Sequence, residues 1–87
     1  MTQFSIVIPT LNESENIDSL LGRLFALNFP AGHFEVIVVD DGSADGTQDK
    51  VRAWSINSNV RLIERKAKPD LTASILAGVA VAQSEVI

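Results

Sequence analysis

The sequence predicts an α/β domain of three layers, in which a parallel sheet is covered by helices on both faces. Three observations predict it. Apolar segments typical of strands alternate with segments of helical periodicity, in the order β-α-β-α-β-α-β. Residues 4–8 and 34–39 are nearly continuous runs of β-branched and aromatic residues, as in strands buried on both faces. The length of 87 residues allows one small core.

The first predicted strand, residues 4–8, ends at Pro9. The helix that follows has one apolar face, formed by Ile17, Leu20, Leu21, Leu24 and Phe25. Asn12 and Glu15 are spaced as a capping box for the start of this helix, and Pro30 and Gly32 mark its end. The second strand, residues 34–39, stops before the sequence Asp-Asp-Gly-Ser.

A second helix is predicted from about residue 47 to residue 55, with Asp45 and Gln48 as its capping pair and with Val51 and Trp54 on its apolar face. Residues 60–64 alternate well enough to predict a third strand.

The third helix is predicted over residues 71–83, with Asp70 or Thr72 as its cap. Its expected apolar face consists of Leu71, Ile75, Val79 and Ala82. Gly78 in its middle should weaken the helix by about 1 kcal/mol relative to Ala, unless close packing requires a glycine there. Residues 85–87 begin a fourth strand, and because the chain ends inside this element we expect an incomplete domain.

Composition argues against several functions. Seven Lys and Arg against eleven Asp and Glu give a net charge of -4, so we expect no nucleic-acid partner. The lack of cysteine excludes a disulfide framework, a cysteine zinc site and a thiol nucleophile, and the one histidine, His33, is expected to be solvated. No apolar run approaches the roughly 20 residues of a membrane helix. We therefore expect a soluble, cytoplasmic protein.

Polar residues follow the first two predicted strands: Pro9, Thr10, Asn12 and Glu13 after the first, and Asp40 and Asp41 after the second. Ligands of open parallel sheets bind at the carboxyl ends of the strands. The chain contains neither Gly-x-x-x-x-Gly-Lys nor Gly-x-Gly-x-x-Gly, the glycine-rich motifs that hold phosphates. Carboxylates accept hydrogen bonds from base N–H and ribose hydroxyl groups, or bind Mg²⁺ or Mn²⁺. We therefore expect a nucleoside across both loops, with its phosphates directed to a metal ion held elsewhere.

Other interpretations of the acidic loop are weaker. Residues 41–46 match the first half of an EF-hand calcium loop, but Arg52 occupies the position of the required glutamate. A phosphoacceptor receiver domain would carry its paired acids after the first strand, not the second. Each loop taken alone also fits simple helix capping, which uses the same residue types. Only the two loops together predict a binding site.

Two segments carry a resemblance to a known family. Residues 5–13 (Ser-Ile-Val-Ile-Pro-Thr-Leu-Asn-Glu) and 36–47 (Val-Ile-Val-Val-Asp-Asp-Gly-Ser-Ala-Asp-Gly-Thr) resemble the opening of family 2 glycosyltransferases, the inverting GT-A type. With residues 14–17, the first segment is similar to the branch that acts on polyprenyl phosphates, such as dolichol-phosphate mannosyltransferases. The resemblance covers essentially all 87 residues. It implies a Rossmann-like GT-A fold, with residues 1–87 as its N-terminal nucleotide-binding half.

The resemblance also implies roles for individual residues. Pro9, Thr10, Asn12 and Glu13 match the first nucleotide-contacting loop of the family, and Asp40 and Asp41 match the acidic pair that holds base and ribose. The metal-binding Asp-x-Asp and the catalytic base of the family follow the fourth strand, so the ligands of Mg²⁺ or Mn²⁺ are expected beyond Ile87. Residues 68–70 (Lys-Pro-Asp) depart from the Gly and basic residue of many relatives.

The implied parent enzyme transfers a sugar from a GDP- or UDP-sugar to a polyprenyl phosphate or a polysaccharide with inversion, at the cytoplasmic face of the membrane. The 87-residue piece alone is expected to be inactive. The implied strand order, 3-2-1 with the fourth strand beside the first, would leave the first strand with a bare edge, so we expect self-association. The competing hypothesis is a non-catalytic nucleotide-binding or interaction module with a degenerate transferase fold.

Overall fold

The computed structural model describes residues 4–27, 34–66, 68–82 and 85–86. The elements alternate as β1 (Phe4–Thr10), α1 (Ile17–Ala26), β2 (Phe34–Asp40), α2 (Thr47–Asn57), β3 (Val60–Glu64), α3 (Leu71–Val81) and β4 (Glu85–Val86). The predicted order of strands and helices is confirmed. The predictions for Pro30, Gly32, His33 and Ile87 lie outside the described residues.

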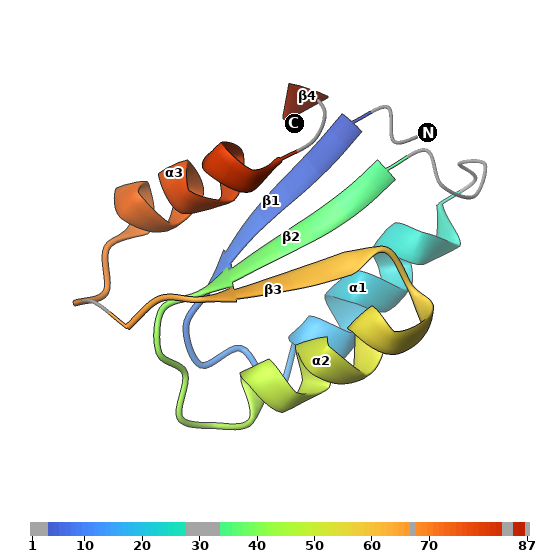
Figure 1. Cartoon of the computed structure of the whole chain (residues 1–87). Helices are drawn as coiled ribbons and strands as arrows, with labels where there is room; N and C mark the ends of the chain where they lie inside the picture. Colours follow the sequence, from blue (N-terminus) through green and yellow to red (C-terminus); the bar gives the residue numbers. More distant parts are fainter. Residues whose placement is uncertain (1–3, 28–33, 67, 83–84, 87) are drawn as a thin grey trace.

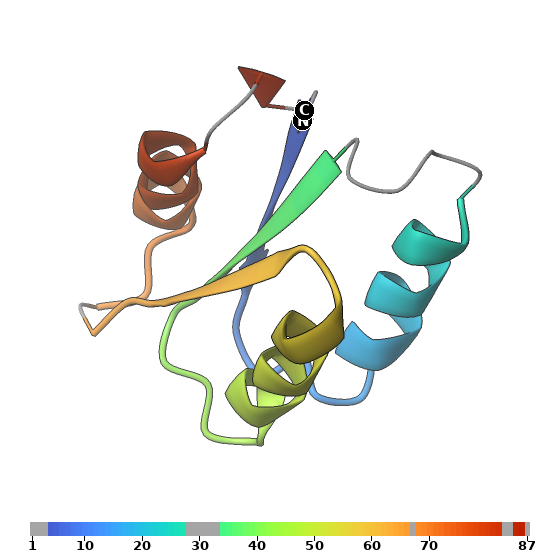
Figure 2. The same ribbon diagram turned by 45° about the vertical axis from the view of Figure 1, so that its right-hand side comes forward.

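The four strands form one parallel sheet in the order β3-β2-β1-β4. Helices α1 and α2 cover one face of the sheet and α3 covers the other, as Figures 1 and 2 show. The three predicted layers and the predicted strand order are therefore confirmed. In the register of the sheet, Thr10 lies opposite Asp40, and Asp40 lies opposite Glu64. The carboxyl ends of β1, β2 and β3 thus meet at one edge.

The main core lies between the sheet and the first two helices. Ile17 and Leu21 of α1 and Val51 of α2 are buried against the inward side chains of β2 and β3. Aromatic rings extend this core: the ring of Phe25 stacks on Phe34 at 5.1 Å and on Trp54 at 5.9 Å between centroids. The predicted apolar faces of both helices are confirmed, except that Leu20 is 41% exposed.

The predicted apolar face of α3 is wrong. Leu71, Ile75 and Val79 are exposed, and α3 instead places Ser74 and Gly78 against β1 and β2. The physical reason is a close approach between helix and sheet. A Cβ atom built on Gly78 would lie 2.4 Å from Val7 Cγ1, so only glycine fits at this contact. Close packing therefore requires a glycine at position 78, as the sequence analysis allowed.

Two predicted capping pairs are also wrong. Asn12 has a φ of 54° and lies before a turn, so α1 begins only at Ile17. At α2 the residue before the helix is Gly46, with a φ of 93°. The Asp45 carboxylate does accept the N–H of Thr47, the first residue of the helix, but Gln48 bonds to Asp40 and does not complete the pair. The cap of α3 is confirmed, since the Asp70 carboxylate accepts a hydrogen bond of 3.1 Å from the Ala73 N–H.

Candidate functional site

The two polar loops at the carboxyl edge of the sheet are tied together by hydrogen bonds. The bonds run from Asn12 N–H to Ser43 Oγ (2.8 Å), from Ala44 N–H to Asn12 Oδ1 (2.9 Å), from Glu13 N–H to Thr47 Oγ1 (2.9 Å) and from Ser14 N–H to Asp45 Oδ2 (3.0 Å). The positive φ of Asn12 lets its backbone and its side chain both face the second loop. The loops predicted separately from the sequence therefore form one rigid unit.

Asp40 is the centre of this unit. Its carboxylate is fully buried and accepts five hydrogen bonds, from Thr10 Oγ1 (2.7 Å), Ser43 Oγ (2.5 Å), Ser43 N–H (2.8 Å), Gly42 N–H (3.1 Å) and Gln48 Nε2 (2.7 Å). Burial raises the pKa of this carboxyl, but the hydrogen bonds from Ser43, Gln48 and Thr10 outweigh burial and the pKa lies below its ordinary value. An ionised Asp40 thus joins the end of β1, the loop after β2 and the first turn of α2.

The Asp45 carboxylate also accepts hydrogen bonds within these loops. The Thr47 hydroxyl and N–H both donate to Asp45 Oδ1, at 2.5 Å and 3.1 Å. The hydroxyl bond of Thr47 is the main reason that the pKa of Asp45 lies far below its ordinary value.

Asp41 is 8% exposed and faces the connection between β3 and α3. Its Oδ1 forms an ion pair with Arg65, and its Oδ2 accepts a hydrogen bond of 3.0 Å from the Asp70 N–H. The pKa of Asp41 lies below its ordinary value: the Ser74 hydroxyl is the largest cause, burial opposes it, and the Asp70 N–H and Arg65 add to it. Asp41 is therefore an ionised acceptor at neutral pH.

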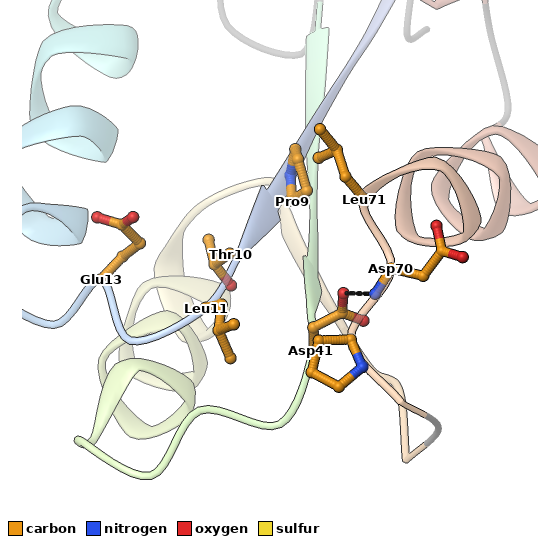
Figure 3. Close-up of a pocket in the computed structure, with 8 residues that line it drawn as sticks. Pro9, Thr10, Leu11, Glu13, Asp41, Asp70 and Leu71 are labelled. Carbon is orange, nitrogen blue, oxygen red and sulfur yellow. Dashed lines mark hydrogen bonds between the residues drawn. The ribbon is translucent and has the colours of Figure 1, made fainter.

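A cavity of about 300 Å³ opens beside Asp41. It is lined by Pro9, Thr10, Leu11, Glu13, Asp41, Pro69, Asp70 and Leu71. In Figure 3, Glu13 lies on one side of the cavity, Asp41, Asp70 and Leu71 lie on the other, and the segment from Pro9 to Leu11 runs between them. Its volume is at the low end of ligand pockets, which run from roughly 300 to 1,000 Å³. The walls combine apolar contact area with carboxylate acceptors.

The six predicted site residues divide into two groups. Pro9, Thr10, Glu13 and Asp41 line the cavity, whereas Asn12 and Asp40 lie off it and connect the loops. The structure thus brings all six to one edge of the sheet.

The sequence did not predict Arg65, Asp70 and Leu71 as parts of the site. These residues follow β3, so the sequence could have indicated that they lie at the same end of the sheet as the two loops. Their contacts with Asp41 depend on the path of the chain from β3 to α3, which the sequence does not indicate. Within the described ranges, no group of three or more His, Asp or Glu side chains is arranged to hold a metal ion. No helix in these ranges is long and apolar enough to cross a membrane.

Comparison with known sequences identifies relatives along nearly the whole chain. A model of the family described as "Glycosyl transferase family 2" matches residues 5–87. The dolichol-phosphate mannosyltransferase of Pyrococcus furiosus is 35% identical over 83 residues, which are 94% of this chain and 23% of that protein. The dolichol-phosphate mannosyltransferase of Saccharomyces cerevisiae is 38% identical over 79 residues, which are 87% of this chain and 30% of that protein.

Solved structures show the same fold. A crystal structure of residues 1–349 of TarS from S. aureus matches with a TM-score of 0.91 and 30% identity, over 99% of this chain and 26% of that one. The mannosyltransferase PcManGT from Pyrobaculum calidifontis, in complex with GDP-Man and Mn²⁺, matches with a TM-score of 0.85 and 26% identity, over 93% of this chain and 24% of that one. The chain spans less than a third of the length of each of these proteins.

Proposed function

The chain belongs to glycosyl transferase family 2, and from this premise we propose that it is the nucleotide-binding part of a glycosyltransferase. The reaction would transfer a sugar, with inversion, from a GDP- or UDP-sugar to a polyprenyl phosphate or a polysaccharide. Relatives named as dolichol-phosphate mannosyltransferases support a polyprenyl phosphate acceptor. Neighbouring structures that hold UDP-GlcNAc or GDP-Man support a nucleotide-sugar donor.

The observation that carries this proposal is the cavity at the carboxyl edge, where an ionised Asp41 faces apolar walls. The remaining lone-pair position of Asp41 would accept an N–H group of the base or a hydroxyl group of the ribose. Pro9, Leu11 and Leu71 would contact the flat faces of the base, and Glu13 would accept a ribose hydroxyl from the opposite side. Both carboxylates suit a nucleoside, which donates hydrogen bonds, better than a phosphate, which they would repel.

Asp40 and Asn12 would belong to the nucleotide site through the loops they hold. All four lone-pair positions of the Asp40 carboxylate are already used by donors of the chain itself. Asn12 uses its side-chain oxygen on the Ala44 N–H. We therefore assign direct contact to Asp41 and support of the loop to Asp40.

The described residues do not form a site for Mg²⁺ or Mn²⁺, and we assign no ligand of such an ion to them. The metal ion of the family would be held by residues of the parent enzyme beyond Ile87, as would the catalytic base. We propose accordingly that the 87-residue chain, residues 1–87 of a larger domain, transfers no sugar by itself. Turnover of GDP-mannose or UDP-glucose by this chain would contradict that assignment. We place the parent enzyme in the cytoplasm, at the membrane face.

The edge of β1 also favours self-association of this chain. In the described structure β4 pairs with β1 only at Phe4 and Ser5, so the rest of that edge, up to Thr10, has no described strand beside it. Exposed strand edges pair with other chains, and the exposed apolar side chains of α3, Leu71 and Leu76 among them, add to this tendency. Sedimentation velocity should show oligomers that increase with concentration, and a monomer at high concentration would contradict the proposal.

The nucleotide proposal is tested by titrating the ¹⁵N-labelled 87-residue chain with UDP and with GDP. We expect amide shifts at Thr10, Glu13, Asp41 and Leu71 with at least one of the two nucleotides. Asp41→Asn keeps the shape of the side chain but removes the charge and one acceptor, and should weaken binding by about tenfold or more. Asp49→Asn is the matched control, because Asp49 lies on the exposed face of α2 with a side chain that is 85% exposed. Unchanged affinity in Asp41→Asn would overturn the assignment.

A further inference from the structure

The charges around the cavity are unbalanced. Three acidic residues line it, Glu13, Asp41 and Asp70. Within the described part of the chain, Arg65 is the cation that pairs with one of them. Lys66 and Lys68 are exposed, and Lys50 donates to the Ser14 carbonyl on the far side of the loops. The chemistry of the cavity therefore depends on how Arg65 is placed.

Arg65 directly follows β3 and is held by the sheet. Its backbone N–H donates to the Asp40 carbonyl at 2.8 Å, which fixes its main chain beside the acidic loop. Its side chain is only 15% exposed. Besides Asp41, its Nη1 reaches the Asp70 carbonyl at 3.4 Å and Ser74 Oγ at 3.3 Å. One guanidinium thus contacts the end of β2, the β3–α3 connection and α3.

We infer that Arg65 is a positioning residue of this site, whose guanidinium holds the Asp41 carboxylate at the wall of the cavity. The inference rests on the proposed nucleotide-binding function. Arg65 does not line the cavity itself, so it would act through Asp41. Arg65 takes Oδ1 of Asp41 and the Asp70 N–H takes Oδ2, so the carboxylate cannot rotate. Because the Ser74 hydroxyl also donates to this carboxylate, one of its four acceptor positions remains for a donor of the ligand.

Arg65 also favours the ionised form of Asp41. The groups that face this carboxyl are Arg65, the Ser74 hydroxyl and the Asp70 N–H, which lower its pKa, and Glu13 on the opposite side of the cavity. The Asp70 carboxylate is turned away from Asp41 and accepts the Ala73 N–H. Removing the Arg65 charge leaves the Asp41 carboxylate without its counterion and raises the pKa of Asp41. Binding that needs the ionised carboxylate persists above this pKa and is lost below it. The acid limit of binding, the pH below which the nucleotide no longer binds, should therefore move to higher pH when Arg65 is lost.

The test compares Arg65→Gln, which removes the charge, with Arg65→Lys, which keeps it. The matched control is Arg61→Gln, because Arg61 also pairs with a buried carboxylate of β2, that of Glu35, but at a position of the sheet away from the cavity. Affinity for UDP and GDP is measured by NMR titration at neutral pH and then at falling pH. The pKa of Asp41 is measured without nucleotide from its side-chain carboxyl ¹³C shift.

We expect Arg65→Gln to bind about tenfold more weakly, the loss of one hydrogen bond to a charged group, and to raise the pKa of Asp41. Arg65→Lys should restore most of the affinity, and Arg61→Gln should leave the affinity unchanged. Equal affinity and equal acid limits in the wild type and in Arg65→Gln would overturn the role of Arg65. If the wild type binds neither nucleotide, the proposed function fails and this inference fails with it. In that case a raised pKa of Asp41 in Arg65→Gln would show only that the ion pair between Arg65 and Asp41 exists.

Discussion

The close contact between α3 and the sheet predicts that Gly78→Ala destabilises the protein. In most helices this change stabilises, because alanine has the better helix propensity by about 1 kcal/mol. At Gly78 the new methyl group would lie 2.4 Å and 3.2 Å from the two Cγ atoms of Val7, and 3.1 Å from Cγ2 of Val39. Both branches of Val7 are involved, so rotation of that side chain does not open the space. Helix and sheet must separate instead.

Overpacking of this kind costs about 1–3 kcal/mol, which exceeds the gain in propensity. Gly78→Ala should therefore lower the free energy of unfolding by about 1 kcal/mol. Gly22→Ala is the control, since a Cβ on Gly22 of α1 meets only Trp54, at an ordinary distance of 4.0 Å. That variant should raise the free energy of unfolding by up to about 1 kcal/mol. The difference between the two variants isolates the cost of overpacking.

The assay is urea unfolding followed by far-UV circular dichroism, with the slopes of the transitions compared as well as their midpoints. Equal stability of Gly78→Ala and Gly22→Ala would refute the reasoning. It would mean that α3 does not approach β1 as closely as the structure shows.

Three further predictions concern the acidic loop. Asp40→Ala leaves five donors without their acceptor and should lower the free energy of unfolding by about 2–4 kcal/mol. In Asp40→Asn the new side chain can turn its oxygen to the three N–H donors and its NH₂ group to the two hydroxyls. Nucleotide affinity should therefore stay within about threefold of the wild type. A loss of affinity as large as in Asp41→Asn would show that Asp40 contacts the nucleotide directly. The pKa values of Asp40, Asp41 and Asp45 all lie below the ordinary value of 3.8, so their stabilisation is present above that pH and is lost as the pH falls below it. Urea midpoints should therefore fall as the pH drops below about 4, less steeply in Asp40→Asn, and parallel pH profiles would contradict the assignment.

The strands could be predicted from the sequence because their signal is local. The runs 4–8 and 34–39 are β-branched on both faces, and a strand buried by helices on both sides needs such a run. The structure extends β1 by Pro9 and Thr10 and extends β2 by Asp40. These residues lie at the carboxyl ends of the strands, where Pro9 is opposite Val39 and Thr10 is opposite Asp40. The polar pair fits there because the Thr10 hydroxyl donates to the Asp40 carboxylate. The meeting of the two polar loops at one end of the sheet followed from this parallel arrangement.

The errors concern features that depend on distant partners. Hydrophobic periodicity placed Leu71 and Ile75 toward the sheet, but helix and sheet approach closely only through small residues such as Ser74 and Gly78. Asn12 was predicted as a helix cap, and its side chain instead bonds to Ala44, 32 positions along the chain. The contact of Arg65 with the site could not be predicted from the sequence, because its ion pair with Asp41 exists only in the folded chain.

Intermolecular NOEs that locate a bound nucleotide would show whether it occupies the cavity beside Asp41. We expect contacts from base and ribose protons to the methyl groups of Leu11 and Leu71, which line that cavity. A second cavity of about 380 Å³ lies on α1 and α2, lined in part by Lys50 and Trp54, and it offers a clear alternative. NOEs to the Trp54 ring instead of the two leucines would contradict the account.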